Sequence, residues 1–307
     1  MHPSLISRES LESTMHLDAK KRSAATVLGL TVLFAATLIT TVQVGAGHDP
    51  VHRQHSNGAA GLTYAILVLS ILGIHEFGHF VAARWRRTAV SFPVFLPSPY
   101  GLGTFGAFVR LKTPVWDRSD SFDIGAAGPI AGLLVAVPLM LYSLWDSSPT
   151  FSLVHPHSLG IRSSLFLTFL YKLVKGGPIP VEIGISDTGF AAWIGIFVSA
   201  LNLLPVGPLD GGRISAALLG AKKAASFQFV TVALGFLLAL FVWSGLLTWA
   251  VLLLIFSLLP PQGTLDEFVV PSAGRYWLGI GLFVFALLVL VPAPGGARLV
   301  MIRCPYM

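Results

Sequence analysis

The chain has 307 residues, of which 54% are hydrophobic and only 11% are charged, and its formal net charge is +6. Soluble domains carry about 25% charged residues, so this composition excludes an ordinary soluble domain and predicts an all-α polytopic membrane protein. The net positive charge does not indicate nucleic-acid binding, because the basic residues cluster beside apolar segments, where they set membrane topology. The single cysteine, Cys304, excludes an intrachain disulfide and a cysteine-rich zinc site.

The N-terminal part of the chain predicts a cytoplasmic tail followed by a first membrane span. Residues 1–25 are polar and end with basic residues directly before an apolar run from about residue 24 to 44. A cleaved signal peptide has an apolar core of about 7–15 residues, so this longer run predicts a retained span. A short polar loop over residues 45–59 then carries His48, His52 and His55, which we interpret as solvated loop histidines rather than a regulatory metal site.

A second span is predicted over residues 61–83, and it contains the motif His75-Glu76-Phe77-Gly78-His79. Histidines four residues apart on a helix lie on the same face, so both imidazoles can bind one metal ion, and Glu76 can take a proton from water beside it. Ionisable side chains are costly inside a bilayer and therefore indicate function. The structural alternative is that His75, Glu76 and His79 only form hydrogen bonds between helices.

Arg84, Arg86 and Arg87 follow this span and predict its cytoplasmic end. Because an α-helix rises about 1.5 Å per residue, His79 and His75 should lie roughly 7 and 14 Å from Arg84 along the helix. The site is therefore expected inside the bilayer, nearer the cytoplasmic side.

Residues 92–123 predict an irregular apolar segment between the second and third spans. The prolines of residues 92–99 exclude a regular helix there, and residues 108–112 alternate at the period of a strand. We expect a short re-entrant loop or β-hairpin that turns back toward the site. Irregular backbone at this depth must be covered by protein or line a wet cavity.

The rest of the chain predicts further spans, giving seven in total, with six as the main alternative. Residues 164–174 favour an amphipathic helix at the membrane interface, and Gly128 and Gly132 favour close helix packing. In this scheme several basic residues lie on the cytoplasmic side of the membrane with Arg84, namely Arg213, Lys222, Lys223 and Arg275. Arg298 and Arg303 lie on the other side, which conflicts mildly with the positive-inside rule. The remaining spans are expected over about residues 124–145, 188–204, 227–259 (two spans turning near residues 244–245) and 276–291.

A catalytic zinc ion needs three protein ligands and an open position, and Asp210 is the best candidate for the third. It follows the fourth span, where Pro205 and Pro208 break the helix and allow a carboxylate to turn inward. The alternative is an ordinary turn aspartate, since Asp-Gly favours turns. Asn202, an amide on an otherwise apolar helix, is predicted to bind a substrate carbonyl or the developing oxyanion, or to bond another helix.

These two motifs together resemble the site-2 protease family of intramembrane zinc metalloproteases. His75-Glu76-Phe77-Gly78-His79 matches the family's H-E-x-x-H pattern, and the segment from Asn202 to Gly211 matches its N-x-x-P-x-x-x-L-D-G pattern. Residues 125–132 also resemble a glycine-proline stretch that is common between the two motifs. The resemblance covers about residues 65–215.

The resemblance implies a metalloprotease that hydrolyses a peptide bond in or near the transmembrane segment of a substrate protein. It implies one Zn²⁺ per chain held by His75, His79 and Asp210, and a water molecule activated by Glu76. The apolar segment, represented by Gly106, Ala107 and Phe108, is expected to pair with the extended substrate by strand addition. The expected location is the cytoplasmic membrane, with the lipid bilayer as environment.

On this basis we divide the chain into an N-terminal tail, a protease domain and a C-terminal tail, at residues 1–25, 26–292 (core 61–215) and 293–307. Two other functions use the same residues: a metal-binding transporter, and a proteolytically inactive protein that binds transmembrane segments. A transporter would depend little on Glu76 and would often show repeated halves, which this sequence lacks. His155 and His157 are interpreted as ordinary loop histidines.

Overall fold

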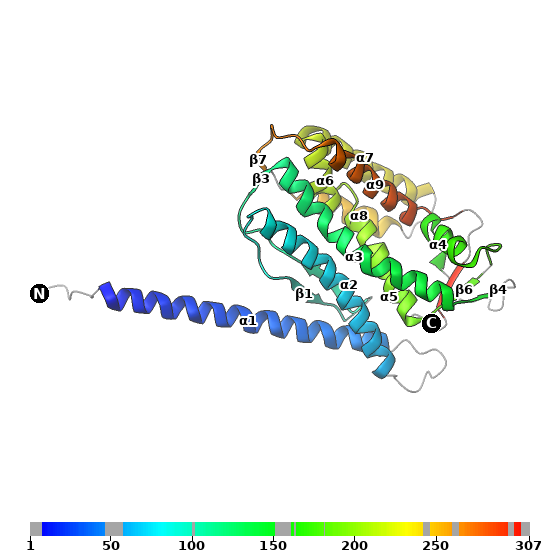
Figure 1. Cartoon of the computed structure of the whole chain (residues 1–307), viewed down its shortest axis with the longest axis horizontal. Coiled ribbons are helices and arrows are strands. Elements are labelled where there is room, and N and C mark those ends of the chain that lie inside the picture. Colours follow the sequence, from blue (N-terminus) through cyan, green and yellow to red (C-terminus); the bar gives the residue numbers. More distant parts are fainter. Residues whose placement is uncertain are drawn as a thin grey trace, which may run out of the picture.

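The computed structural model describes residues 8–46, 58–99, 102–150, 161–162, 164–180, 182–241, 246–259, 264–293 and 298–301. It shows a bundle of helices with short strands at its margins (Figure 1). The helices are α1 (Arg8–Ala46), α2 (Gly58–Trp85), α3 (Arg118–Asp146), α4 (Leu165–Lys175), α5 (Asp187–Asn202), α6 (Asp210–Leu219), α7 (Ala221–Phe241), α8 (Leu246–Ser257) and α9 (Ala273–Leu290). The strands are β1 (Val94–Pro97), β2 (Thr104–Phe108), β3 (Val115–Asp117), β4 (Ser148–Thr150), β5 (Ile161–Arg162), β6 (Glu182–Ile185), β7 (Thr264–Asp266) and β8 (Arg298–Met301).

Within the described residues, five helices are long and apolar enough to cross a membrane: residues 26–46 of α1, and α2, α3, α7 and α9. The predicted fourth span corresponds to α5, which has only 16 residues, and α8 has 12. At about 1.5 Å per residue these helices reach roughly 24 and 18 Å, short of a hydrocarbon core of about 30 Å. The predicted count of seven, or of six, is therefore not confirmed.

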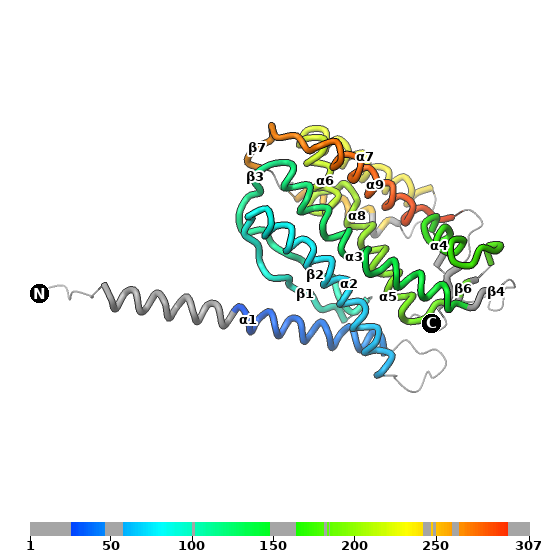
Figure 2. The backbone as a smooth tube through the Cα atoms, in the orientation of Figure 1, coloured from blue at the N-terminus to red at the C-terminus, as the bar shows by residue number. Residues whose placement is uncertain are grey.

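The helices α2, α3 and α5 pack side by side in the bundle (Figure 2). Their side chains contribute most of the main hydrophobic core, to which α4, α6 and α9 also contribute residues. Ile71, Met140 and Ile194, one from each of α2, α3 and α5, are almost completely buried. Glycines bring these helices close together, because a Cβ atom on Gly78 or Gly195 would collide with α3 or α2. Small residues at helix contacts are the usual way to pack helices in lipid, where no hydrophobic force pulls them together.

The segment between α2 and α3 contains an antiparallel hairpin of β1 and β2, as predicted. The expected strand over residues 108–112 is wrong in detail, because β2 ends at Phe108 and only an isolated bridge joins Leu111 to Val90. The hairpin is tied to the first two helices at its turn. The Thr40 hydroxyl donates to the Gly103 carbonyl oxygen at 2.7 Å, and the Tyr64 hydroxyl donates to the Leu102 carbonyl oxygen at 3.2 Å.

The expectation of an all-α fold is too simple, because three small sheets lie among the described residues. Besides the hairpin, β3 pairs with β7, and a four-stranded sheet has the order β4-β6-β8-β5. Its strands have two to four residues, too few to show a strand period in the sequence. Strand β8 lies in the segment that we predicted to be a tail.

The predicted amphipathic helix is present as α4, and its location at a membrane interface stays a prediction. Ser164 begins the helix by accepting a hydrogen bond from the Leu167 N–H at 3.3 Å. Gly176, with φ of 68°, ends it in the left-handed conformation that glycine adopts without strain. Lys175 donates to the Trp145 carbonyl oxygen at 2.7 Å, which ties α4 to the end of α3.

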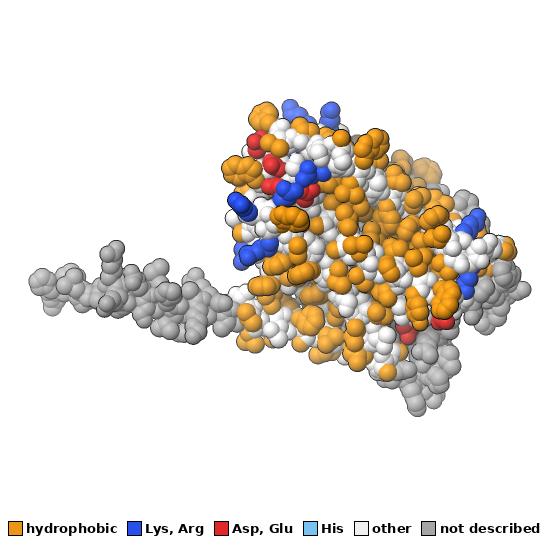
Figure 3. All heavy atoms as spheres, in the orientation of Figure 1, with side chains coloured by type: hydrophobic (Ala, Val, Ile, Leu, Met, Phe, Trp, Pro, Cys, Tyr) orange, Lys and Arg blue, Asp and Glu red, His pale blue; other side chains and the backbone are white. Residues whose placement is uncertain are grey.

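Charged side chains gather mainly toward the two ends of the bundle, and a broad hydrophobic surface lies between them (Figure 3). At one end Asp123 of α3 binds two arginines: Arg275 of α9, through Nε at 2.8 Å, and Arg86, which follows α2. The structure therefore puts Arg86 and Arg275 on the same side of the bundle, as the sequence predicted. A polar end beside an apolar band is typical of a protein that crosses a bilayer.

Candidate functional site

The motif of α2 lies within a continuous helix of 28 residues. His75, Glu76 and His79 are all buried, with exposed fractions of 3%, 8% and 9%. The two imidazole rings stand one turn apart, and their centres are 5.1 Å from each other. Helical geometry alone therefore places both histidines on one face of α2.

The opposite side of the site is built by the break between α5 and α6. The chain turns sharply after Asn202, and Asp210 is the first residue of α6. The turn requires glycine: a Cβ atom on Gly211 would meet the Leu203 carbonyl oxygen, and one on Gly207 would meet that of Phe256. Gly207 also has a positive φ of 47°. The break thus aims Asp210 toward α2, as the sequence predicted.

Asp210 lies between the two histidines. Its Oδ2 is 3.2 Å from His75 Nε2, and its Oδ1 is 3.2 Å from His79 Nε2. One ligand atom from each of the three residues lies within 4.8 Å of the others. Zinc binds nitrogen and oxygen at about 2.0–2.2 Å in a tetrahedron, which places neighbouring ligand atoms about 3.3–3.5 Å apart. The donor set and its spacing therefore fit a zinc ion.

The orientation of His79 is set by α3. Its Nδ1–H donates to the Ile124 carbonyl oxygen at 2.7 Å, which leaves Nε2 facing Asp210 as the nitrogen that could bind a metal ion. Gly128 lies directly against the His79 ring, where a Cβ atom would overlap it, and a Cβ atom on Gly132 would be 3.2 Å from His75 Nδ1. The two glycines serve close helix packing, as predicted: Gly128 makes room for His79, and Gly132 makes room for His75.

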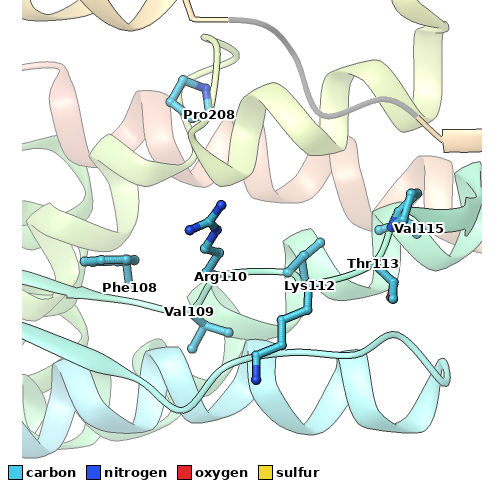
Figure 4. A pocket seen from close by; sticks show the side chains of 9 residues that line it. Phe108, Val109, Arg110, Lys112, Thr113, Val115 and Pro208 are labelled. Carbon is cyan, nitrogen blue, oxygen red and sulfur yellow. The ribbon is translucent and has the colours of Figure 1, made fainter. Parts of the chain in front are cut away.

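Glu76 faces the segment that follows the hairpin. Its carboxylate lies near the backbone N–H of Val109, the residue after β2. Phe108 and Val109 also line a groove of about 640 Å³, which Pro208 closes from the other side (Figure 4). The predicted substrate-binding residues Gly106, Ala107 and Phe108 therefore belong to a strand that ends beside Glu76.

The structure does not join Asn202 to the three candidate ligands. It is the last residue of α5 and is half-buried, but within the described residues no hydrogen bond or ion pair links it to His75, His79 or Asp210. Its role stays a prediction. The loop histidines at positions 48, 52, 55, 155 and 157 lie outside the described residues.

Gln228 on α7 was missed by the sequence analysis. Its side-chain oxygen accepts a hydrogen bond from the Gly207 N–H at 2.7 Å, and its side-chain nitrogen donates to the Ser257 carbonyl oxygen at 3.1 Å. The amide thus connects the turn before Asp210 to the end of α8. A polar residue in an apolar span was a usable signal. The two backbone groups that it binds could not be read from the sequence.

Arg213 is a second residue that the sequence analysis did not connect with the site. It lies one helical turn after Asp210 on α6, and its side chain packs against Gly125 of α3. Its guanidinium is close enough to Asp210 to interact with it electrostatically. Arg213 is half-buried, its guanidinium Nη1 atom is fully buried, and it brings a positive charge close to Asp210.

Comparison with known proteins connects this site with metalloproteases. Residues 63–243 match the sequence profile of peptidase family M50. The chain is 30% identical over 237 residues to "Probable zinc metalloprotease EGY2, chloroplastic" of Oryza sativa subsp. indica, covering 76% of this chain and 43% of that protein. It is 33% identical over 239 residues to "Probable zinc metalloprotease EGY1, chloroplastic" of Arabidopsis thaliana, covering 75% of this chain and 43% of that protein. The chain thus spans less than half the length of these relatives.

Proposed function

Because the chain belongs to peptidase family M50, the site-2 protease family, we propose that it is a membrane-embedded zinc metalloprotease. Its substrate would be a membrane protein, cut in or near a transmembrane segment. The observation that carries this proposal is the grouping of three possible metal ligands, His75, His79 and Asp210, beside Glu76. The helix that carries the two histidines and Glu76, α2, is long and apolar enough to cross a bilayer. The membership also confirms the resemblance seen in the two sequence motifs.

The proposed roles follow from the donor set. His75, His79 and Asp210 would hold zinc, which when bound supplies Lewis-acid activation of water and of the scissile carbonyl group. Glu76 would accept a proton from the attacking water at a carboxylate oxygen and deliver it to the leaving amine nitrogen. The Ile124 carbonyl oxygen holds the His79 ring in the orientation that this arrangement needs. Asn202 would steady the substrate carbonyl or the oxyanion.

We propose that the substrate binds as an extended strand beside β2. Within the described residues β2 pairs with β1 alone, so no second strand covers its other edge. The Thr104 hydroxyl bonds to the Gly106 N–H at 3.0 Å and to the Gly106 carbonyl oxygen at 3.2 Å, so a substrate strand beside Gly106 would compete with these bonds. An added strand gains backbone hydrogen bonds without demanding one sequence. A strand placed there would pass close to Glu76, since the backbone of Val109 already does.

For the membrane arrangement, we propose that the N terminus and the arginine-rich end of α2 face the cytoplasm. The support is the positive-inside rule together with the common position of Arg86 and Arg275 at one end of the bundle. The hairpin would then be a re-entrant element that enters from that face, with its turn reaching Tyr64 near the start of α2. The cytoplasmic membrane is the proposed location, although the printed names of the relatives describe chloroplast proteins.

The direct test is cleavage of a membrane-spanning reporter by the purified full chain, with bound metal measured on the same preparation. We expect about one zinc ion per chain, cleavage within or next to the spanning segment, loss of cleavage with a chelator and recovery when zinc is restored. A metal transporter would bind the ion and leave every reporter intact. Zinc-free protein prepared without chelator would contradict the assignment of the site.

Gln228 gives a prediction about the turn that carries Asp210. Replacing Gln228 with leucine keeps the size of the side chain but leaves the Gly207 N–H and the Ser257 carbonyl group without their partner. Because an unsatisfied buried polar group costs about 1–3 kcal/mol, we expect zinc affinity to fall about tenfold and kcat to fall with it. Zinc titration and reporter cleavage measure both.

The matched control is Thr231→Val on the same helix, where, among the described residues, the hydroxyl bonds only to the Phe227 carbonyl oxygen of its own helix. This control should bind zinc and cut the reporter like the wild type. If Gln228→Leu also behaves like the wild type, the turn does not need the amide.

A further inference from the structure

The groove of Figure 4 is lined by residues 108–115, which lead from the end of β2 to the start of β3, and by Pro208. One wall is the segment that follows β2, and the other is the turn before α6, two residues from Asp210. Its volume is about 640 Å³. The lining residues are Phe108, Val109, Arg110, Leu111, Lys112, Thr113, Pro114, Val115 and Pro208.

An extended chain that leaves the β2 edge would enter this groove. Phe108 is the last residue of β2, and Val109, whose backbone N–H lies near Glu76, is the next residue in the lining. The groove therefore begins where the scissile bond would lie. A substrate bound along β2 would have its continuation between residues 109–115 and Pro208.

The lining contains two positive charges and no acidic residue. Arg110 and Lys112 are exposed, and within the described ranges their side chains form neither a hydrogen bond nor an ion pair. In Figure 4 the Arg110 side chain extends toward Pro208, across the groove. In contrast, Arg86 and Arg275 are paired with the same carboxylate. A cleft lined by one sign of charge attracts ligands of the opposite sign.

The groove opens at the arginine-rich end of α2. Its wall runs beside the residues that follow this helix, because the Ser91 N–H donates to the Arg110 carbonyl oxygen at 2.9 Å and the Lys112 N–H donates to the Ala89 carbonyl oxygen at 2.7 Å. A substrate segment in the groove would thus be leaving the apolar part of the bundle. It would be the flank next to the spanning segment and not its centre.

From these observations we propose that the groove selects substrates whose flank, next to the scissile bond at this end of the bundle, carries aspartate or glutamate residues. The proposal rests on the proposed protease function and names the chemistry of its substrate. Arg110, whose side chain crosses the groove, would pair with a substrate carboxylate, and Lys112, whose side chain extends away from Pro208, would add positive charge to the same wall (Figure 4). Pairs of this kind at an exposed site change affinity by about two- to fivefold each, and salt weakens them.

The experiment compares two reporters that share one spanning segment and differ only in this flank, with Asp and Glu in one and Asn and Gln in the other. The full chain is placed in phosphatidylcholine vesicles, whose lipids carry no net charge. We expect kcat/KM to be about tenfold higher for the acidic flank at low salt, with the difference shrinking as salt is raised. In R110E/K112E the preference should reverse, and bound zinc should stay at the wild-type level.

The matched control is K222E/K223E, which reverses two exposed lysines at the start of α7 that do not line the groove. It should keep the preference for the acidic flank. Equal cleavage of both reporters by the wild type, or an unchanged preference in R110E/K112E, would overturn the proposal while leaving the protease function intact. Failure of the wild type to cut either reporter would overturn the protease function and this inference with it.

Discussion

Replacing Glu76 with glutamine should leave zinc bound and lower the rate of peptide-bond cleavage by about 100- to 10,000-fold, the range for losing a general base. Glutamine has nearly the same shape, so the adjacent ligands should stay in place, but its amide cannot accept the proton from water. The carboxylate is well placed for this task, since it is buried on the same turn of α2 as His75 and His79. Single-turnover cleavage of the reporter and zinc analysis of the same sample measure the two properties separately.

The control for this substitution is Glu267→Gln, which makes the same chemical change at an exposed position. It should cut at the wild-type rate. If Glu76→Gln holds zinc and still cuts within a few-fold of the wild type, Glu76 is not the base. If both the wild type and the variant hold zinc and neither cuts any reporter, the alternatives of a transporter or an inactive binder gain support.

Replacing Asp210 with asparagine should remove zinc together with activity, which separates it from Glu76→Gln. The substitution keeps the size of the side chain and removes the negative charge that lies 3.2 Å from both imidazole Nε2 atoms. Zinc prefers anionic oxygen ligands, so the remaining pair of histidines should bind it weakly. Because Lewis-acid activation is worth several kcal/mol, and each 1.4 kcal/mol is tenfold in rate, cleavage should fall by at least about a thousandfold.

Zinc content after dialysis and reporter cleavage test this prediction together. Asp146→Asn, at the exposed end of α3, is the matched control and should keep both properties. Stoichiometric zinc in Asp210→Asn would show that another residue is the third ligand. An unfolded variant would be recognised by comparing its thermal unfolding with that of the Asp146→Asn control.

The two variants together separate binding of the metal from use of the metal. Glu76→Gln should give a protein that is loaded and inactive, whereas Asp210→Asn should give one that is empty and inactive. If the protein is an ion transporter, Glu76→Gln should have little effect and Asp210→Asn a large one, because transport depends on the metal ligands and not on a general base. The pair therefore tests the proposed roles of the site residues independently of the natural substrate.

The sequence determined the local half of the site. Backbone hydrogen bonds give an α-helix 3.6 residues per turn, so the spacing of His75 and His79 was enough to put both on one face. The apolar run around them predicted a helix over residues 61–83, and α2 confirms the helix but extends beyond both ends, from Gly58 to Trp85. The prolines and glycines around Asp210 likewise predicted a break in the helix before Asp210, because their effect on the backbone is local. The structure has this break between α5 and α6.

Only the tertiary structure decided what meets across the chain. Asp210 lies 135 residues from His75, and their contact depends on how α2, α3 and α6 pack. Gly128 lies against the His79 ring because α2 and α3 pack closely. Gln228 binds the Gly207 N–H in the turn before Asp210 because α7 lies beside that turn. The sequence also predicted more spans than the five that the described residues support by length and composition, and it predicted no sheet beyond the hairpin. Short helices and strands have too few residues to show a period, and their ends are fixed by partners far away in the chain.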